Sequence, residues 1–270
     1  MPLGAVKSLG RRLIGTHRRS NSVRALHQLA SFVESAYWNE GSSFRTNGER
    51  QLLDRLLAAN FQTAVDVGAN CGDWMMAALD AWPQCRVHAF EVAPMTFQRL
   101  QNHLAESAGR DRATLNCLGL SDTPGRQTMF YFPEHPELTS DLPRHETLRR
   151  VPFEAQLCTG DEYAESHAIG TIDFLKIDVE GAEHRVLKGF SGYLAAHKIH
   201  CVQFEYGAFS TQTRFLLGDY YTLLSPNYWI GKIYPAYVDF RDYDWTMEDF
   251  RFANYCCVSK LRPDLRSLLT

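Results

Sequence analysis

The sequence predicts an α/β fold: a doubly wound, mainly parallel sheet of seven strands with an antiparallel edge strand, preceded by N-terminal helices. Three observations support it. From residue 62 onward, short apolar runs of strand length alternate with segments of helical periodicity. Several of these apolar runs end in Asp or Glu, as strands beside a ligand site often do. A chain of 270 residues is long enough to bury the core of one large α/β domain.

The first 46 residues are expected to form a basic leader with one helix, acting as a cap or partly disordered. Residues 1–25 contain no acid, and residues 22–37 carry apolar residues at helical spacing. The segment could be a mitochondrial presequence, or a basic arm that touches a membrane surface or an acidic partner. We favour a partly ordered, solvated leader. Its cations are Lys7, Arg11, Arg12, Arg18, Arg19 and Arg24.

Residues 47–270 are expected to form the main domain. An amphipathic helix over 48–59 precedes the first strand, and with 22–37 it is a candidate cap over a ligand site. The predicted strands are 62–67, 86–91, 113–120, 171–177 and 200–204, followed by a closing hairpin of 228–233 and 254–259. The predicted helices between them are 73–81, 94–108 with Pro at its start, 182–190 and 211–224.

Residues 123–170 interrupt this alternation. Two segments, 125–132 and 151–157, look extended, and the stretch 133–150 between them is rich in Pro, His, Glu and Arg. A loop this long inside a compact domain is usually functional, so we expect a substrate-facing insertion. His135 and His145 are candidate bases, although each is more typical of a solvated loop histidine.

Composition excludes several classes of protein. A net charge of −3 gives no overall basic field, so nucleic acid is not an expected partner. No apolar run reaches the roughly 18 residues of a membrane span. The seven cysteines show no Cys-x-x-Cys pair and suggest reduced thiols in a cytoplasmic protein.

The most informative motif follows the first predicted strand, where Asp66-Val-Gly68-Ala-Asn70-Cys-Gly72 leads into a helix. Glycine removes the Cβ that would block a ligand, and the helix start offers free N–H groups. The motif is neither G-x-G-x-x-G nor a P-loop. Asp66 would repel a pyrophosphate but suits a ligand that carries an ammonium group. S-adenosylmethionine meets that requirement.

Acids and a serine follow the next strands. Glu91 ends the second strand about 20 residues after the glycine turn, where an acid can accept hydrogen bonds from ribose hydroxyls. Ser121 and Asp122 follow the third strand and are placed beside an adenine ring. The predicted cofactor-binding residues are therefore Asp66, Gly68, Asn70, Gly72, Glu91, Ser121 and Asp122.

A second cluster follows the fourth and fifth main strands. Lys176 lies within a buried apolar run and needs a carboxylate partner. Asp178, Glu180 and Glu205 lie at the carboxyl ends of strands and are the predicted catalytic residues. Glu183 fits a helix-start acid as well as a catalytic one.

Taken together, these blocks resemble the FkbM family of S-adenosylmethionine-dependent methyltransferases over about residues 47–259. The matching blocks are 66–72, 90–94, 120–125, 173–189, 204–205 and 254–255. The resemblance implies a class I methyltransferase fold, which is Rossmann-like, and O-methylation of a hydroxyl on a sugar, glycan or secondary metabolite.

The chemistry leaves two routes open for activating such a hydroxyl. The carboxylates could act as a general base, or Asp178 and Glu205 could hold a Mg²⁺ that acidifies the hydroxyl. We favour the base. The alternatives to a methyltransferase are an NAD-dependent oxidoreductase and a non-catalytic adaptor that retains the fold. The sequence leaves the acceptor and the oligomeric state open.

Overall fold

The computed structural model describes residues 3–142 and 148–270. Its internal contacts divide the chain into two compact units, Met1–Gly41 and Ser42–Thr270. The first unit contains helices α1 (Leu3–Thr16) and α2 (Asn21–Tyr37), and α2 buries none of its residues. The role of this unit as a leader or cap stays a prediction.

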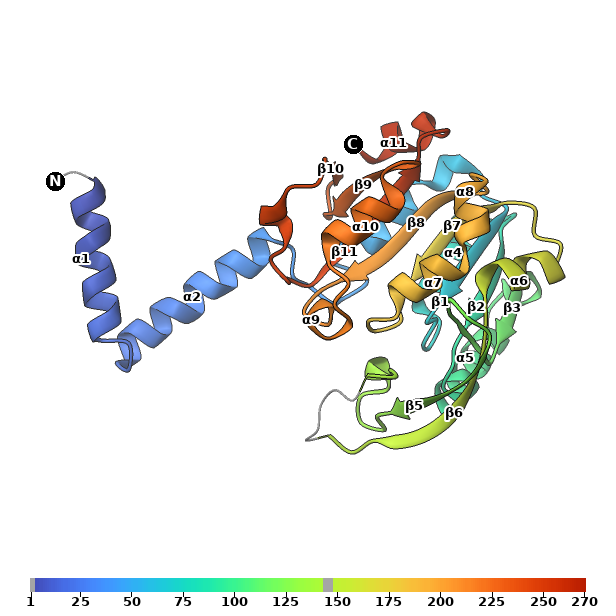
Figure 1. The fold of residues 1–270 in the computed structure, drawn as a ribbon, viewed down its shortest axis with the longest axis horizontal. Helices are drawn as coiled ribbons and strands as arrows, with labels where there is room; N and C mark the ends of the chain where they lie inside the picture. Colours follow the sequence, from blue (N-terminus) through green and yellow to red (C-terminus); the bar gives the residue numbers. More distant parts are fainter. Residues whose placement is uncertain (1–2, 143–147) are drawn as a thin grey trace. The chain divides into compact units, whose positions relative to one another are not determined.

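The second unit is built on a mixed, mainly parallel sheet (Figure 1). Within the described residues eight strands hydrogen-bond in the order β10-β9-β11-β8-β7-β1-β2-β3. The five neighbouring strands β8, β7, β1, β2 and β3 run parallel to one another. Strand β11 is antiparallel to both β8 and β9. Their bounds are β1 Thr63–Val67, β2 Arg86–Phe90, β3 Ala113–Asn116, β7 Ile172–Ile177, β8 Ile199–Tyr206, β9 Tyr228–Ile233, β10 Val238–Phe240 and β11 Ala253–Ser259.

The predicted fold class is confirmed, with two corrections to the sheet. A short eighth strand, β10, extends the seven that were expected, and it forms the antiparallel edge. The antiparallel strand β11 lies inside the sheet, between β8 and β9, because it pairs with both of them along its length. The predicted pairing of residues 228–233 with 254–259 is present.

Successive side chains of the central strands point to opposite faces of the sheet and belong to two separate hydrophobic cores. Val65 and Leu175 join the core that includes α6, α7, α8 and α10, whereas Ala64 and Phe174 join the core that includes α3, α4, α5 and α11. Burial on both faces explains why these strands are nearly continuous apolar runs. The helices are α3 Glu49–Arg55, α4 Asp73–Ala81, α5 Pro94–Ala105, α6 Gly160–Ser166, α7 Glu183–Gly189, α8 Ser191–Ala195, α9 Ser210–Thr213, α10 Leu217–Leu224 and α11 Pro263–Leu269.

The predicted strand 113–120 is wrong in its second half. Strand β3 ends at Asn116, and β4 (Gly119–Leu120) joins β5 (Gly125–Tyr131) and β6 (Val151–Cys158) in a separate sheet of order β4-β6-β5. The two extended segments of the insertion pair with each other in antiparallel register. His145 lies outside the described residues.

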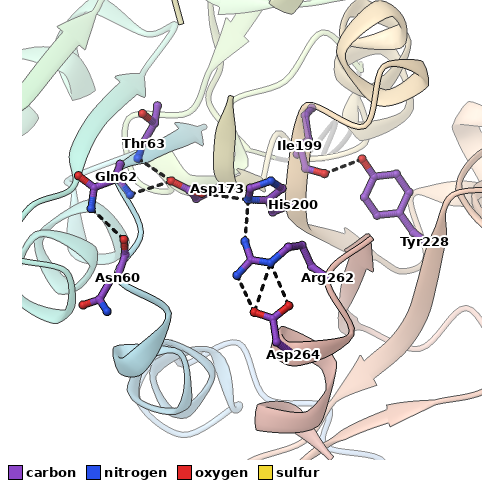
Figure 2. A network of polar contacts seen from close by, with 9 residues as sticks. All are labelled: Asn60, Gln62, Thr63, Asp173, Ile199, His200, Tyr228, Arg262 and Asp264. Carbon is purple, nitrogen blue, oxygen red and sulfur yellow. Dashed lines mark hydrogen bonds and ion pairs between the residues drawn. The ribbon is translucent and has the colours of Figure 1, made fainter. Parts of the chain in front are cut away.

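A polar network ties together the amino ends of β1, β7 and β8 (Figure 2). The backbone N–H groups of Gln62 and Thr63 donate to Asp173 Oδ2 at 2.7 and 3.0 Å. His200 Nδ1 lies 2.9 Å from Asp173 Oδ1 and 3.0 Å from Arg262 Nη1. Burial opposes ionisation, but the bonds from His200 and the two amides hold the pKa of Asp173 below its usual value.

Two further observations bear on cellular context. All seven cysteines are free thiols. No helix in the described part of the chain is both long and apolar enough to cross a membrane. A cytoplasmic location stays a prediction.

Candidate active site

A cavity of about 350 Å³ opens at the carboxyl edge of the parallel strands. Gly68 and Asn70 follow β1, Glu91 follows β2, Asp178 follows β7, and Glu205 lies near the end of β8, and all of them line it. Parallel strands bring their carboxyl ends to one edge, which is why residues far apart in sequence meet here. The volume suits a small-molecule ligand.

The turn after β1 depends on glycine at Gly68, where φ is +83°. A Cβ at that position would lie 1.8 Å from the backbone oxygen of Asp178, so only glycine lets this turn approach the loop after β7. Gly72 also has a positive φ, +93°, and a Cβ there would lie 2.7 Å from Leu100 Cδ1. Gly72 therefore packs the start of α4 against α5, outside the cavity lining.

Glu91 joins this turn to the second strand. Its carboxylate accepts hydrogen bonds from the backbone N–H groups of Asn70 at 3.0 Å and Ala93 at 2.8 Å. The side chain is buried in the protein but faces the cavity. Burial raises its pKa to about 7, even though the two amide donors lower it. Glu91 thus presents a rigidly held acceptor to the ligand space.

Asp66 lies behind the cavity wall, fully buried and not among the lining residues. The predicted need of Lys176 for a carboxylate is met twice: its Nζ lies 3.1 Å from Asp178 Oδ2 and 3.7 Å from Asp66 Oδ1. The longer distance exceeds an ordinary hydrogen bond, and neither Asp66 oxygen has a hydrogen-bond partner among the described residues. Burial raises the pKa of Asp66 to about 6, although Lys176 lowers it.

Asp178, Glu180 and Glu205 are brought together as the sequence predicted. One ligand atom from each lies within 4.8 Å of the others. Glu205 is 6% exposed, and burial, followed by the charges of Asp178 and Glu180, raises its pKa well above the usual value. Glu205 is also hydrogen-bonded to Asp178. Burial and the neighbouring charges therefore favour the protonated form of Glu205.

Glu183 lies outside this group, fully buried and away from the cavity lining. Its Oε1 accepts from the backbone N–H groups of Val179 and Gly181, each at 3.1 Å. These bonds hold the turn that carries Asp178 and Glu180, where Glu180 adopts a φ of +56°. Burial raises the pKa of Glu183 to about 7. Its role in this structure is to position the turn.

The two residues predicted beside adenine separate in the structure. Ser121 is buried and lines the cavity, and its hydroxyl donates to Asp122 Oδ1 at 3.2 Å. Asp122 is exposed and is not among the lining residues. Asp122 is therefore placed to orient the Ser121 hydroxyl rather than to form the cavity wall.

Sequence reasoning missed Glu49, which enters the cavity wall from the start of α3. Its carboxylate accepts from Asn47 Nδ2 at 2.7 Å and Gln203 Nε2 at 2.6 Å, with Asn254 Nδ2 at 3.4 Å. Burial raises its pKa, although Lys176 lowers it. Glu49 gave no signal in the sequence, because an acid at a helix start is common. The available signal was its partner Gln203, a polar residue inside an apolar strand that needs a buried hydrogen-bond partner.

The opposite wall comes from the insertion and α7. Gln127 in β5 donates to Asp141 Oδ2 at 2.7 Å, and Arg185 forms an ion pair with Asp141. Among the described lining residues Arg185 is the single cation, against seven acids. The acids are Glu49, Glu91, Glu137, Asp141, Asp178, Glu180 and Glu205. Because that cation is paired with Asp141, the described lining offers an anion no free positive charge.

Comparison with known proteins gives a family match. The model of the methyltransferase FkbM domain matches residues 66–237, more than half of the chain. The 31-O-demethyl-FK506 methyltransferase FkbM of Streptomyces tacrolimicus is 33% identical over 156 residues, covering 46% of this chain and 57% of that protein. Methyltransferase sdnD of Sordaria araneosa is 32% identical over 155 residues, with coverage of 46% and 59%.

Two further similarities are more distant. Hexuronic acid methyltransferase AglP of Haloferax volcanii is 29% identical over 164 residues, covering 59% of this chain and 64% of that protein. The matches thus span less than two thirds of these curated relatives. A crystal structure of methyltransferase FkbM from Methylobacillus flagellatus KT aligns with a TM-score of 0.48 at 19% identity, covering 73% of this chain and 44% of that one.

Proposed function

The chain belongs to the FkbM family of S-adenosylmethionine-dependent methyltransferases, and from this premise we propose that it methylates a hydroxyl oxygen of a sugar, glycan or secondary metabolite. The observation that carries the proposal is one cavity that joins a glycine turn, Gly68, to the carboxyl pair Asp178 and Glu205. The turn and Glu91 suit the methyl donor. The carboxyl pair suits a hydroxyl acceptor, because a hydroxyl must lose a proton when it is methylated.

The residues present fit S-adenosylmethionine, which when bound supplies an electrophilic methyl group on a sulfonium. Gly68 leaves open the space that a Cβ would fill, and Glu91 presents a fixed acceptor for hydroxyl groups. The acidic lining favours a ligand with an ammonium and a sulfonium. Gly68, Asn70, Glu91 and Ser121 would hold it, with the buried charge of Asp66 behind them.

Asp178 is the best candidate to receive the acceptor's proton. It is partly exposed in the cavity, whereas Glu205 is almost fully buried and burial raises its pKa well above the usual value. Lys176, 3.1 Å from Asp178, stabilises the ionised form of the pair and fixes its orientation. Alignment of the acceptor oxygen by these groups would supply much of the rate gain.

The three acids also fit a divalent cation, because carboxylate oxygens are the ligands that Mg²⁺ prefers. We favour the general base, because burial raises the pKa of Glu205 well above its usual value and a protonated carboxyl is a poor metal ligand. Loss of transfer in EDTA, restored by Mg²⁺, would instead support the metal route.

The lining also bears on the acceptor. Seven acids face the cavity and the one lining cation among the described residues, Arg185, is paired with Asp141. A carboxylate on the acceptor would find no unpaired cation among the described lining residues, because Arg185 is held by Asp141. We therefore expect an uncharged acceptor, in contrast to the hexuronic acid named for the Haloferax volcanii relative.

The experiment is methyl transfer from labelled S-adenosylmethionine to a panel of neutral sugars, uronic acids and polyhydroxylated metabolites, read by product mass. We expect a neutral polyol to be methylated on oxygen. Calorimetry with S-adenosylmethionine and with NAD runs beside it. Binding of NAD alone would favour the oxidoreductase, and binding of neither would favour the adaptor.

A further inference from the structure

Helix α2 carries an apolar face that the structure leaves uncovered. Leu26, Leu29 and Val33 follow one another at spacings of three and four residues, and Tyr37 continues the same stripe. Their exposed fractions are 54%, 60%, 57% and 73%, and Phe32 at the edge of the stripe is 68% exposed. Arg24, His27 and Ser31 occupy the other face. Helix α2 is therefore strongly amphipathic, with an apolar side in solvent.

The connection between α1 and α2 forms a second cavity, of about 540 Å³, with a basic rim. Three arginines line it, Arg18, Arg19 and Arg24, together with the apolar residues Ile14 and Val23. All three arginine side chains are exposed, and no acid lines this cavity among the described residues. Guanidinium groups and apolar side chains in one lining match a phosphate group joined to an acyl chain.

The α1–α2 arm has the charge that such a partner requires. Residues 3–37 contain six cations and one acid, Glu34, against a net charge of −3 for the complete chain. The longest described helix of the arm has 17 residues and is not apolar enough to cross a bilayer. An amphipathic helix that follows a basic segment, as α2 follows the cations of α1 and the connection, can lie in the plane of an interface with its apolar side among the acyl chains.

We propose that the α1–α2 arm binds the surface of an anionic lipid bilayer, with the α2 stripe inserted and the arginine cavity holding lipid phosphates. Two properties of the arm favour a bilayer as the partner: its arginines and the exposed apolar stripe of α2. Nucleic acid would use the arginines but leave the apolar stripe in water. A groove on an acidic protein is the competing partner for such a helix, and failure to bind anionic vesicles would favour it. Bilayer attachment would place the catalytic unit near membrane-associated acceptors.

The test is flotation of the full chain with vesicles of phosphatidylcholine that contain 30% phosphatidylglycerol, compared with pure phosphatidylcholine. We expect binding to the anionic vesicles. The triple variant R18Q/R19Q/R24Q should bind about 100-fold more weakly, because each basic residue near an anionic surface contributes about fivefold. The variant L26S/L29S/V33S should lose at least tenfold, since it removes inserted apolar surface.

The matched control is R99Q/R110Q/R126Q, which removes three exposed arginines from the second unit and should bind like the wild type. Circular dichroism and the melting temperature of the second unit should be unchanged in all variants. The proposal is overturned if the wild type binds neither vesicle, if it binds both equally, or if R18Q/R19Q/R24Q floats like the control. Retention on duplex DNA without vesicle binding would also overturn it.

Discussion

At the scale of single residues, burial keeps protons on acids that water would ionise. Glu91 and Glu183 have pKa values raised to about 7 by desolvation, and burial also raises the pKa of Glu205 well above its usual value. Their roles differ by what each carboxyl contacts. Glu91 and Glu183 accept backbone N–H bonds and shape turns, whereas Glu205 contacts the acid that faces the cavity. Glu183 gives the clearest pH test, because it lies away from the ligand space.

The prediction concerns Glu183→Gln and the pH dependence of stability. The carboxyl ionises near pH 4.5 in the unfolded chain but near 7 in the folded one, so its contribution is full below 4.5 and is lost as the pH rises through 7. Gln cannot ionise. The free energy of unfolding of the variant, relative to wild type, should therefore rise by about 3 kcal/mol between about pH 5 and pH 8.

Denaturant unfolding at both pH values measures this difference. The exposed Glu165→Gln variant serves as the control and should track the wild type at each pH. A Glu183→Gln difference that stays constant with pH would show that Glu183 is ionised in the folded protein.

At the scale of elements, the site depends on how closely the turn after β1 meets the loop after β7. The contact between Gly68 and the Asp178 carbonyl fixes that separation, and Glu183 fixes the β7 loop from the other side. The turn after β1 and the loop after β7 are therefore held together by this close approach and by the hydrogen bond from the Asp178 N–H to the Val67 carbonyl at 2.9 Å.

Gly68→Ala should break this junction. The added Cβ would collide with backbone and would require a φ of +83° from alanine, so we expect a loss of at least about 2 kcal/mol of stability. Binding of S-adenosylmethionine should fall at least tenfold in calorimetry. Gly170→Ala is the control, because a Cβ there meets nothing within 4 Å. Unchanged binding by Gly68→Ala would mean that the turn does not shape the ligand space.

At the opposite end of the same strands, Asp173 is predicted to be purely structural. Asp173→Ala removes the acceptor of two backbone amides and should cost about 2–4 kcal/mol in denaturant unfolding, with binding of S-adenosylmethionine retained. Because its folded pKa is lowered, its contribution is present above about pH 4 and is lost as the pH falls through the folded pKa.

Asp264→Ala is the matched change in the same network. Its carboxylate is largely exposed and pairs with Arg262, so its removal should cost less than about 1 kcal/mol. Equal losses for the two variants would contradict the central place given to Asp173.

At the scale of the whole molecule, the features that could be predicted from the sequence are those that a local residue pattern determines. Strands buried on both faces are recognisable as apolar runs, and helix starts carry Pro94 or the turn at Gly72. The change of sheet between Asn116 and Gly119 was not predictable, because one apolar run can serve two sheets and the partner β6 lies far along the chain. Strand β10, with three residues, is too short for a pattern.

The candidate site divides in the same way. The acids that end strands, Asp178 and Glu205, were predictable because parallel strands place their ends together. Glu49 was not, since its approach depends on the packing of α3 against the sheet. The position of Asp66 beside Lys176, outside the cavity lining, was not predictable either. It depends on charges that meet only in the folded protein.

The central claim is that the Asp178–Glu205 pair serves the acceptor while the turn at Gly68 serves the donor. Asp178→Asn tests it most directly, with Glu137→Gln, another acid of the cavity lining, as control. We predict that Asp178→Asn binds S-adenosylmethionine like the wild type in calorimetry and loses methyl transfer at least 100-fold. Transfer by Asp178→Asn at the wild-type rate would contradict the account.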